Sequence, residues 1–319
     1  MIEAGVQTAW GWLIALYLFL GGMGGSMVVI GYLHHVRSKQ NHLAAVGSLV
    51  GVILVALGTL FLIGDLTKPE KFYLVFLSPR LNPGSWIFRG SLILTLFIAF
   101  GLLYAAPQIK YFHWLPWAKN EKVIRYLGLV AASFGFLTVM YTGILISMAR
   151  AVAFWQSPAL PMLFIASGLS TGVAGMLFVN VVQGIRASGE RREMHFHWCH
   201  ELSLWDAILI SVEILVTFLY LYIVSASSPE AALSVNELLF GSLSIPFTVG
   251  VLLLGLAIPF LLEYLHITRG KTASEIVRDK GVFKPCLLPI TAATLVIIGG
   301  IVLRYAILAA GIKTIVIMT

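Results

Sequence analysis

Residues 10–35 read WGWLIALYLFLGGMGGSMVVIGYLHH, an apolar run that contains no Asp, Glu, Lys or Arg. A transmembrane helix needs about 20 mostly apolar residues, so this run is long enough to cross a bilayer. It lacks the basic start of a secretory signal, and we predict that it is retained as a helix. Similar runs follow, and together they predict eight spans at residues 10–35, 42–64, 88–106, 123–149, 159–186, 202–225, 243–266 and 286–311.

The composition agrees with a membrane protein that has no water-soluble domain of its own. The chain of 319 residues is 59% hydrophobic and 11% charged, with a mean hydropathy of +0.93. Soluble domains are about 25% charged, so a soluble fold would lack a polar surface here. The net charge of +7 does not indicate nucleic-acid binding, because the basic residues lie in short loops between apolar runs.

The basic loop residues predict the orientation of the spans. The loops after the first, third, fifth and seventh spans hold most of the 21 Lys and Arg residues: Arg37, Lys39, Lys110, Lys119, Lys122, Arg125, Arg186, Arg191, Arg192, Arg269, Lys271, Arg278, Lys280 and Lys284. The positive-inside rule therefore places both termini outside. We predict an all-α integral membrane protein of two four-helix bundles, residues 1–151 and 152–319.

The longest predicted outside loop, residues 65–88, begins DLTKPEKFYLVFLSPRLNPGSW and is rich in proline, aromatic and charged residues. Loops of this length usually carry function, and this composition favours an ordered lid over a flexible tether. An aromatic interfacial anchor is the alternative. We favour a partner-docking surface, with candidate residues Lys68, Pro69, Tyr73, Arg80, Trp86 and Arg89.

Ionisable residues at membrane depth are costly and are functional candidates. Glu213 lies near the middle of the sixth predicted span, and Arg304 lies in the eighth. Asp65 begins the outside loop, and Arg150 ends the fourth span. One hypothesis is a proton path through Asp65, Glu213 and Arg304, because burial disfavours the charged form of a carboxyl and lets it exchange protons. A structural ion pair of Glu213 with Arg304 is equally compatible with the sequence.

Polar groups also converge near the outer surface of the first half. Tyr17 lies about 10 Å below the outer end of its helix, and Tyr141 about 12 Å below the outer end of the fourth span, at 1.5 Å per residue. Asp65 ends the second span on the same side. Under an aromatic lid, two hydroxyls and a carboxylate are able to hold a quinone headgroup. Buried hydroxyls that bond neighbouring helices are the simpler interpretation of each tyrosine.

The histidines and cysteines do not predict a redox centre in this protein. All eight histidines fall at or near the inside ends of the spans: His34, His35, His42, His113, His195, His197, His200 and His266. Two haems across a membrane need axial histidines near both faces, so haem is not expected. The run HFHWCH at 195–200 has metal-ligand residue types without a known spacing, and an interfacial loop is the favoured interpretation. Cys199 and Cys286 lack partners at metal-ligand spacing, so neither an iron–sulfur site nor any other metal site is predicted.

Several motifs together resemble the NrfD-like family, which includes the polysulfide reductase membrane subunit. They are YLFLGGMGGS at 17–26, GDLTKPEKFY at 64–73, NPGSW at 82–86, YTGILISMARAVAFWQSPALPMLFIASGLSTG at 141–172 and GGIVLRYAILAAG at 299–311. The resemblance covers nearly the whole chain.

The resemblance implies a quinone-reactive membrane anchor of a respiratory oxidoreductase in a bacterial or archaeal cytoplasmic membrane. It implies quinone or quinol, with menaquinone favoured, and no haem or iron–sulfur cluster in this chain. Partners would be a four-cluster ferredoxin-like iron–sulfur subunit on the outer face and, through it, a molybdopterin catalytic subunit or a multihaem cytochrome. Tyr141, Asp65 and Arg304 match functional positions of the family. The polar residues expected on the first helix are missing, and Trp12 and Tyr17 are the candidates there.

Two alternatives compete with a quinone-reactive anchor. Eight helices in two halves with buried charges also fit a secondary transporter of a small solute, although its site would lie nearer the midplane. A purely structural anchor without quinone is the other. Co-purification with a cysteine-rich ferredoxin-like protein separates an anchor from a transporter, and binding of a quinone-site inhibitor separates a reactive anchor from a structural one.

Overall fold

The structure is a computed structural model that describes residues 2–6, 10–38, 42–77, 84–109, 112, 114–187, 190–269 and 286–316. Part of the predicted lid, 78–83 with Arg80, lies outside these ranges, and so does His113. The same holds for six of the basic loop residues behind the predicted orientation: Lys39, Lys110, Lys271, Arg278, Lys280 and Lys284.

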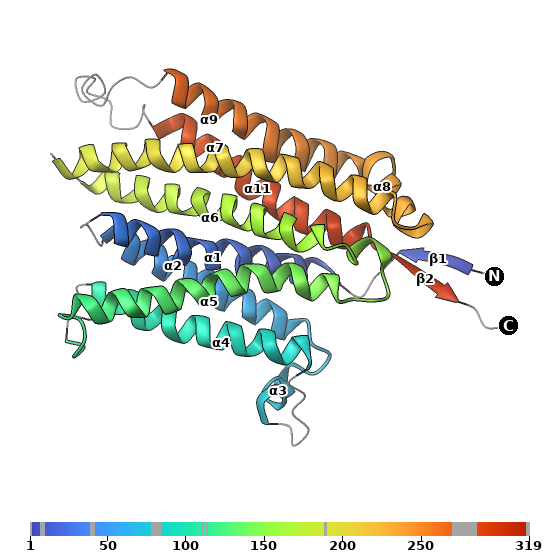
Figure 1. Ribbon diagram of the computed structural model, residues 1–319, viewed down its shortest axis with the longest axis horizontal. Coiled ribbons are helices and arrows are strands. Elements are labelled where there is room, and N and C mark those ends of the chain that lie inside the picture. The colour runs from blue at the N-terminus through green and yellow to red at the C-terminus, as the bar shows by residue number, and fades with distance from the viewer. Residues whose placement is uncertain are drawn as a thin grey trace.

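Eight helices within the described ranges are long and apolar enough to cross a membrane, which confirms the predicted fold class. They are α1 (Trp12–Arg37), α2 (His42–Gly64), α4 (Trp86–Ala105), α5 (Glu121–Ser147), α6 (Ala159–Arg186), α7 (Glu190–Ser225), the π-helix η5 (Pro246–Ala257) continued by α9 (Ile258–Arg269), and α11 (Leu287–Ala309). Short 3-10 turns extend α4 (Ala106–Gln108) and precede α6 (Ala153–Trp155). The helices run along the long axis of the molecule (Figure 1).

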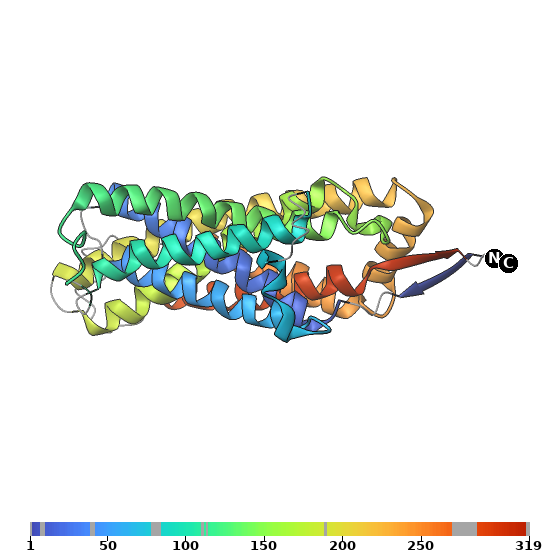
Figure 2. The same ribbon diagram turned by 90° about the horizontal axis from the view of Figure 1, so that it is seen from below.

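Both termini lie at the same end of the molecule, which we call the outer end after the predicted orientation; the opposite end is the inner end (Figure 1). Strand β1 (Ile2–Val6) pairs antiparallel with β2 (Ile312–Val316), with Ile2 opposite Val316. This two-stranded ribbon projects beyond the helices (Figure 2). The sequence did not predict it.

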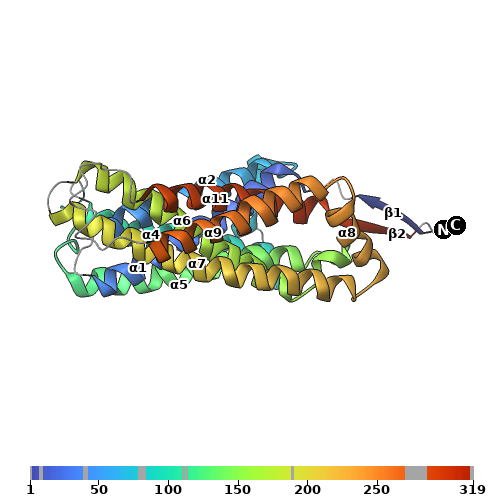
Figure 3. The same ribbon diagram turned by 90° about the horizontal axis from the view of Figure 1, so that it is seen from above.

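Two short helices also lie at the outer end. The lid contains a 3-10 turn, Pro69–Lys71, and helix α3 (Leu74–Leu77) beside α4. Helix α8 (Pro229–Phe240) follows α7 and lies near the ribbon (Figure 3). The Ser228 hydroxyl accepts a hydrogen bond from the Ala231 amide at 3.2 Å, and Pro229 occupies the first helical position. These are standard signals for a helix start.

Helix α1 is the centre of the bundle because its glycines allow close approach on several sides. It packs against α2, α5, α6 and α11. A Cβ atom on Gly25 would lie 2.7 Å from the Gly135 carbonyl oxygen of α5, and one on Gly22 would lie 3.6 Å from the Gly168 Cα of α6. Small residues at such crossings let membrane helices pack closely. The GGMGG segment therefore explains why α1 lies between both halves.

The two halves are also joined at the outer end by aromatic side chains. Trp10 stacks on Trp155 with ring centroids 5.1 Å apart, and the Trp155 indole donates to the Ile307 carbonyl at 2.9 Å. Helices α1 and α11 both pack on α6, so contacts cross between residues 1–151 and 152–319. The division into two four-helix bundles stays a prediction.

Candidate functional site

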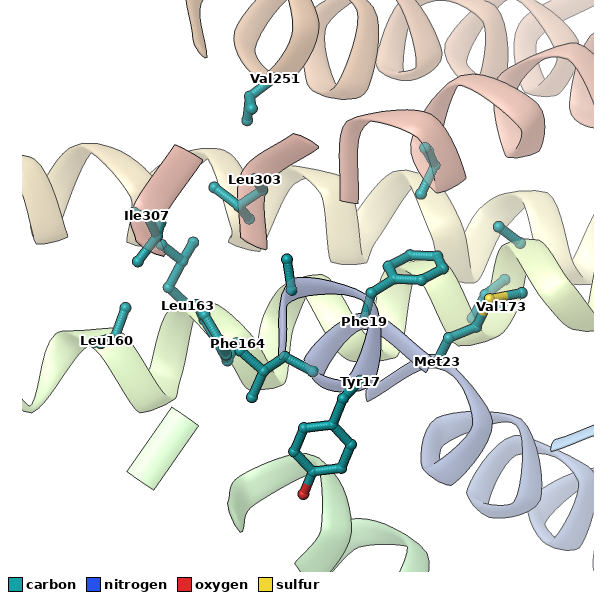
Figure 4. Packing of buried hydrophobic residues seen from close by; sticks show 14 of the residues in the cluster. Tyr17, Phe19, Met23, Leu160, Leu163, Phe164, Val173, Val251, Leu303 and Ile307 are labelled. Carbon is teal, nitrogen blue, oxygen red and sulfur yellow. The ribbon is translucent and has the colours of Figure 1, made fainter. Parts of the chain in front are cut away.

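Tyr17 and Tyr141 are neighbours inside the first half, near the outer end. Tyr17 on α1 is fully buried, and its electrostatic neighbour is Tyr141 on α5. Figure 4 shows Tyr17 pointing toward α5, while Phe19 on the same helix points to the other side. A Cβ atom on Gly90 of α4 would overlap the Tyr141 ring, so this glycine makes room for the phenol.

The Tyr17 hydroxyl is a buried polar atom without a hydrogen-bond partner among the described residues. Buried polar groups are normally bonded, so an exception needs an explanation. The unbonded Tyr17 hydroxyl, beside the Tyr141 phenol, is able to donate a hydrogen bond to an oxygen atom of a ligand. A quinone carbonyl is such an acceptor.

Asp65 lies at the outer rim and not between the two tyrosines. It follows the last residue of α2, is half-buried, and donates its backbone amide to the Phe61 carbonyl at 3.1 Å. The structure thus places two of the predicted quinone residues near each other and the third at the end of α2.

Trp12 has a different position from the other candidates of this site. Its ring stacks on Tyr305 of α11 with centroids 3.9 Å apart and planes 8° apart. It is 53% exposed. Trp12 therefore lies at the seam between α1 and α11, beside the helix that carries Arg304.

The described part of the lid presents aromatic and basic side chains at the surface. Tyr73 is 47% exposed, and Lys68 and Pro69 are also exposed. The Arg89 guanidinium lies over the Trp86 ring, 5.2 Å from its centroid. The described part of the lid contains the turn Pro69–Lys71 and helix α3, and its role in partner docking stays a prediction.

Arg304 is fully buried and is held by helix α6. Its guanidinium donates to the Ser167 hydroxyl and to the Gly300 carbonyl, the latter at 3.3 Å, and lies 5.1 Å from the centroid of the Phe164 ring. Glu213 on α7 is 4% exposed and has Ser167 and Arg304 as its polar neighbours. No direct ion pair joins the two among the described residues, and the Ser167 hydroxyl is the polar neighbour that they share.

Two further buried carboxyls are those of Asp206, which is a neighbour of Glu213, and of Glu263, which is a neighbour of Asp206. Neither was predicted from the sequence. Asp206 lies on α7 about two helical turns from Glu213, and Ser170 donates to its Oδ1 at 2.9 Å. Glu263 on α9 is fully buried, with Ser203 and Asp206 as polar neighbours. Asp206 and Glu263 both fall inside predicted spans, so the charge-in-span signal that found Glu213 applies to them as well.

A family model described as "Polysulphide reductase, NrfD" matches residues 2–316. The chain belongs to the NrfD polysulphide reductase family. It is 28% identical to the C subunit of the polysulfide reductase of Wolinella succinogenes over 97% of this protein and 96% of the relative. Protein NrfD of Escherichia coli is 27% identical, and a Protein NrfD homolog of Haemophilus influenzae is 24% identical, with the same coverage of both proteins.

The inner end of this NrfD-family protein uses its histidines in helix contacts. His35 and the Tyr104 hydroxyl are 2.9 Å apart, and the His195 ring is 2.8 Å from the Asn180 amide oxygen. His34 meets the Trp198 ring edge-on, with centroids 3.8 Å apart. No group of three metal-ligating side chains occurs among the residues that the structure describes.

The prediction that residues 195–200 form an interfacial loop was wrong. The HFHWCH run is helical, because α7 begins at Glu190 and extends well beyond the predicted span. His195 bonds to α6, and His197 forms an i, i+4 pair with Glu201 at 3.5 Å. These contacts stabilise the helical extension of α7. The hydropathy pattern did not predict this extension, because its residues are mostly polar.

Proposed function

We propose that this protein is the membrane subunit of a multi-subunit respiratory oxidoreductase that exchanges electrons between the quinone pool and an iron–sulfur subunit docked at the outer end. The family match over residues 2–316 carries this proposal, together with the neighbouring Tyr17 and Tyr141 near the outer end. The family favours this function over a solute transporter. The relative in Wolinella succinogenes is itself named as one subunit of a polysulfide reductase.

The quinone headgroup binds between α1, α2, α4 and α5 in this proposal. Tyr141 donates a hydrogen bond to one quinone oxygen, and the buried Tyr17 hydroxyl donates another to the same headgroup. Quinol oxidation releases two electrons and two protons. The electrons pass to the partner, and Asp65 at the rim accepts the protons and passes them to water.

The outer location matters because no redox centre is expected in this protein. Electrons must travel from the headgroup to a partner, so a site beneath the outer surface shortens that distance. We propose that Lys68, Pro69, Tyr73, Trp86 and Arg89, with Arg80, contact the iron–sulfur subunit. Exposed aromatic and arginine side chains are enriched at protein interfaces.

A second part of the proposal is proton transfer through the second half. Glu213 and Arg304 are its predicted members, and we add Asp206 because its Oδ1 accepts a hydrogen bond from Ser170 of α6, one turn from the Ser167 that bonds Arg304. Buried carboxyls that are linked by hydroxyls are able to hold and pass protons.

Co-purification and inhibitor binding test the proposed assembly and site. Affinity purification of the tagged protein from its native membrane should recover a cysteine-rich ferredoxin-like subunit, and the double variant Lys68→Glu, Tyr73→Ala should reduce that recovery. The complex should bind a quinone-site inhibitor. If the protein purifies alone and accumulates a solute in vesicles, it is a transporter instead. If the complex does not bind the inhibitor, the protein is a structural anchor.

A further inference from the structure

Two cavities lie at the inner end, far from the tyrosine pair. One has a volume of about 620 Å³ and the other of about 290 Å³, sizes that suit ligand binding. His34, Leu43 and Trp198 line both. Because the edge-on pair of His34 and Trp198 lines both cavities, we treat the two together and call them the inner cavity.

The walls of the inner cavity are mostly apolar and open toward the bilayer. The first cavity includes Val46, Phe178 and Val182, and the second includes Leu33 and Trp205. Leu33, Val182 and Trp205 are between 43% and 49% exposed although they belong to membrane-spanning helices. Their exposed surface therefore faces hydrocarbon and gives an acyl chain access from the side.

The rim of the inner cavity is basic. Arg186 lines the larger cavity at the inner end of α6, and Arg37 lines the smaller one at the inner end of α1. Both side chains are exposed, and Arg37 lies 5.4 Å from the centroid of the Trp205 ring. Glu201 is the acidic residue in the two linings, and it already pairs with His197.

A buried imidazole points to a polar ligand between these arginines. His34 is 7% exposed, and its Nδ1 has no hydrogen-bond partner among the described residues. A phosphate oxygen accepts hydrogen bonds from an imidazole and from guanidinium groups. Both cavities thus combine the His34 ring and apolar walls with one arginine each, a setting that matches a ligand with an anionic head and apolar chains.

We propose that the inner cavity binds an anionic phospholipid of the inner leaflet. Its phosphate lies at the rim with Arg37, Arg186 and His34, and its acyl chains follow the apolar walls across both cavities. Basic pockets between helices on the cytoplasmic side of membranes recognise such headgroups. The lipid seals the inner contact of α1 and α2 with α6 and α7, at the opposite end from the proposed quinone site.

Lipid titration of the delipidated complex tests the chemistry of the ligand. Phosphatidylglycerol should raise the unfolding temperature and remain bound in native mass spectrometry, while phosphatidylcholine with the same acyl chains should do neither. Equal effects of both lipids would overturn the need for an anionic head. An equal shift from inorganic phosphate alone would mean a free-anion site, and displacement of the lipid by a short-chain quinone would mean a second quinone pocket; either result contradicts the proposal.

Arginine variants locate the site. Arg37→Gln and Arg186→Gln should each weaken phosphatidylglycerol binding about fivefold, since one basic residue near a membrane surface contributes about one kcal/mol to anionic-lipid attraction. Arg125→Gln is the matched control, because Arg125 lies at the same end, pairs with Glu121 at 3.9 Å and lines neither cavity. Native-like lipid affinity in the double variant Arg37→Gln, Arg186→Gln would refute the site. Quinol oxidation in these variants reports the proposed function separately.

Discussion

The buried polar residues of the second half act through a shared hydroxyl. Ser167 accepts a hydrogen bond from Arg304 and faces Glu213, so one side chain serves both charged groups. The sequence identified Glu213 and Arg304 because a charge inside an apolar run is visible. It did not identify Ser167, since a serine in a membrane helix is common and its partner lies on a helix far away in the sequence.

Replacement of Ser167 by alanine should destabilise the protein by about 1–3 kcal/mol, because a buried donor of Arg304 loses its acceptor. Thermal unfolding in detergent measures this change. Ser211→Ala is the control, since the exposed Ser211 hydroxyl donates to the Ala207 carbonyl of its own helix. Equal stability of the two variants would show that Ser167 does not hold Arg304.

Glu213→Gln separates proton transfer from structure. If Glu213 carries protons, the variant should retain quinol oxidation and lose most of the proton translocation that accompanies it, because an amide cannot release a proton. Proteoliposomes with an internal pH indicator measure this. Loss of expression or stability with unchanged coupling would identify Glu213 as a structural residue instead.

At the scale of elements, the eight spans follow from hydropathy, since the bilayer requires long apolar helices. The helical extension of α7 and the outer helix α8 were missed because both lie in polar sequence outside the spans. The capping signal at Ser228 and Pro229 was present for α8. The pairing of β1 with β2 joins the two ends of the sequence, and no local pattern predicts such a distant contact.

The crossing of α1 and α5 depends on glycine. Gly25→Ala should destabilise the bundle by about 1–3 kcal/mol, because the added methyl group meets the backbone of Gly135 and the helices must separate. Gly64→Ala is the matched control, since a Cβ atom there has no neighbour within 4 Å. Thermal unfolding of both variants checks this, and an equal effect would show that α1 and α5 tolerate a wider crossing.

At the scale of the whole molecule, the two ends have different chemistry. Among the described residues, the outer end carries the tyrosine pair, the start of the lid, helix α8 and the ribbon, and the inner end carries the histidines and the inner cavity. The sequence predicted Tyr17 and Tyr141 at a common depth from helix length alone. It could not place Trp12 on Tyr305, because that contact depends on how α11 packs against α1, and the two helices lie far apart in the sequence.

Quinol oxidation by the purified complex with Tyr141→Phe examines the proposed quinone site most directly. The variant should assemble normally and lose at least about tenfold of its quinol-linked turnover, since one hydrogen bond in a buried site contributes about 1.4 kcal/mol or more. Tyr220→Phe is the matched control: Tyr220 is also buried at the outer end, and its hydroxyl donates to the Phe154 carbonyl at 2.8 Å. Native turnover in Tyr141→Phe, or an equal loss in Tyr220→Phe, would contradict a quinone site at Tyr141.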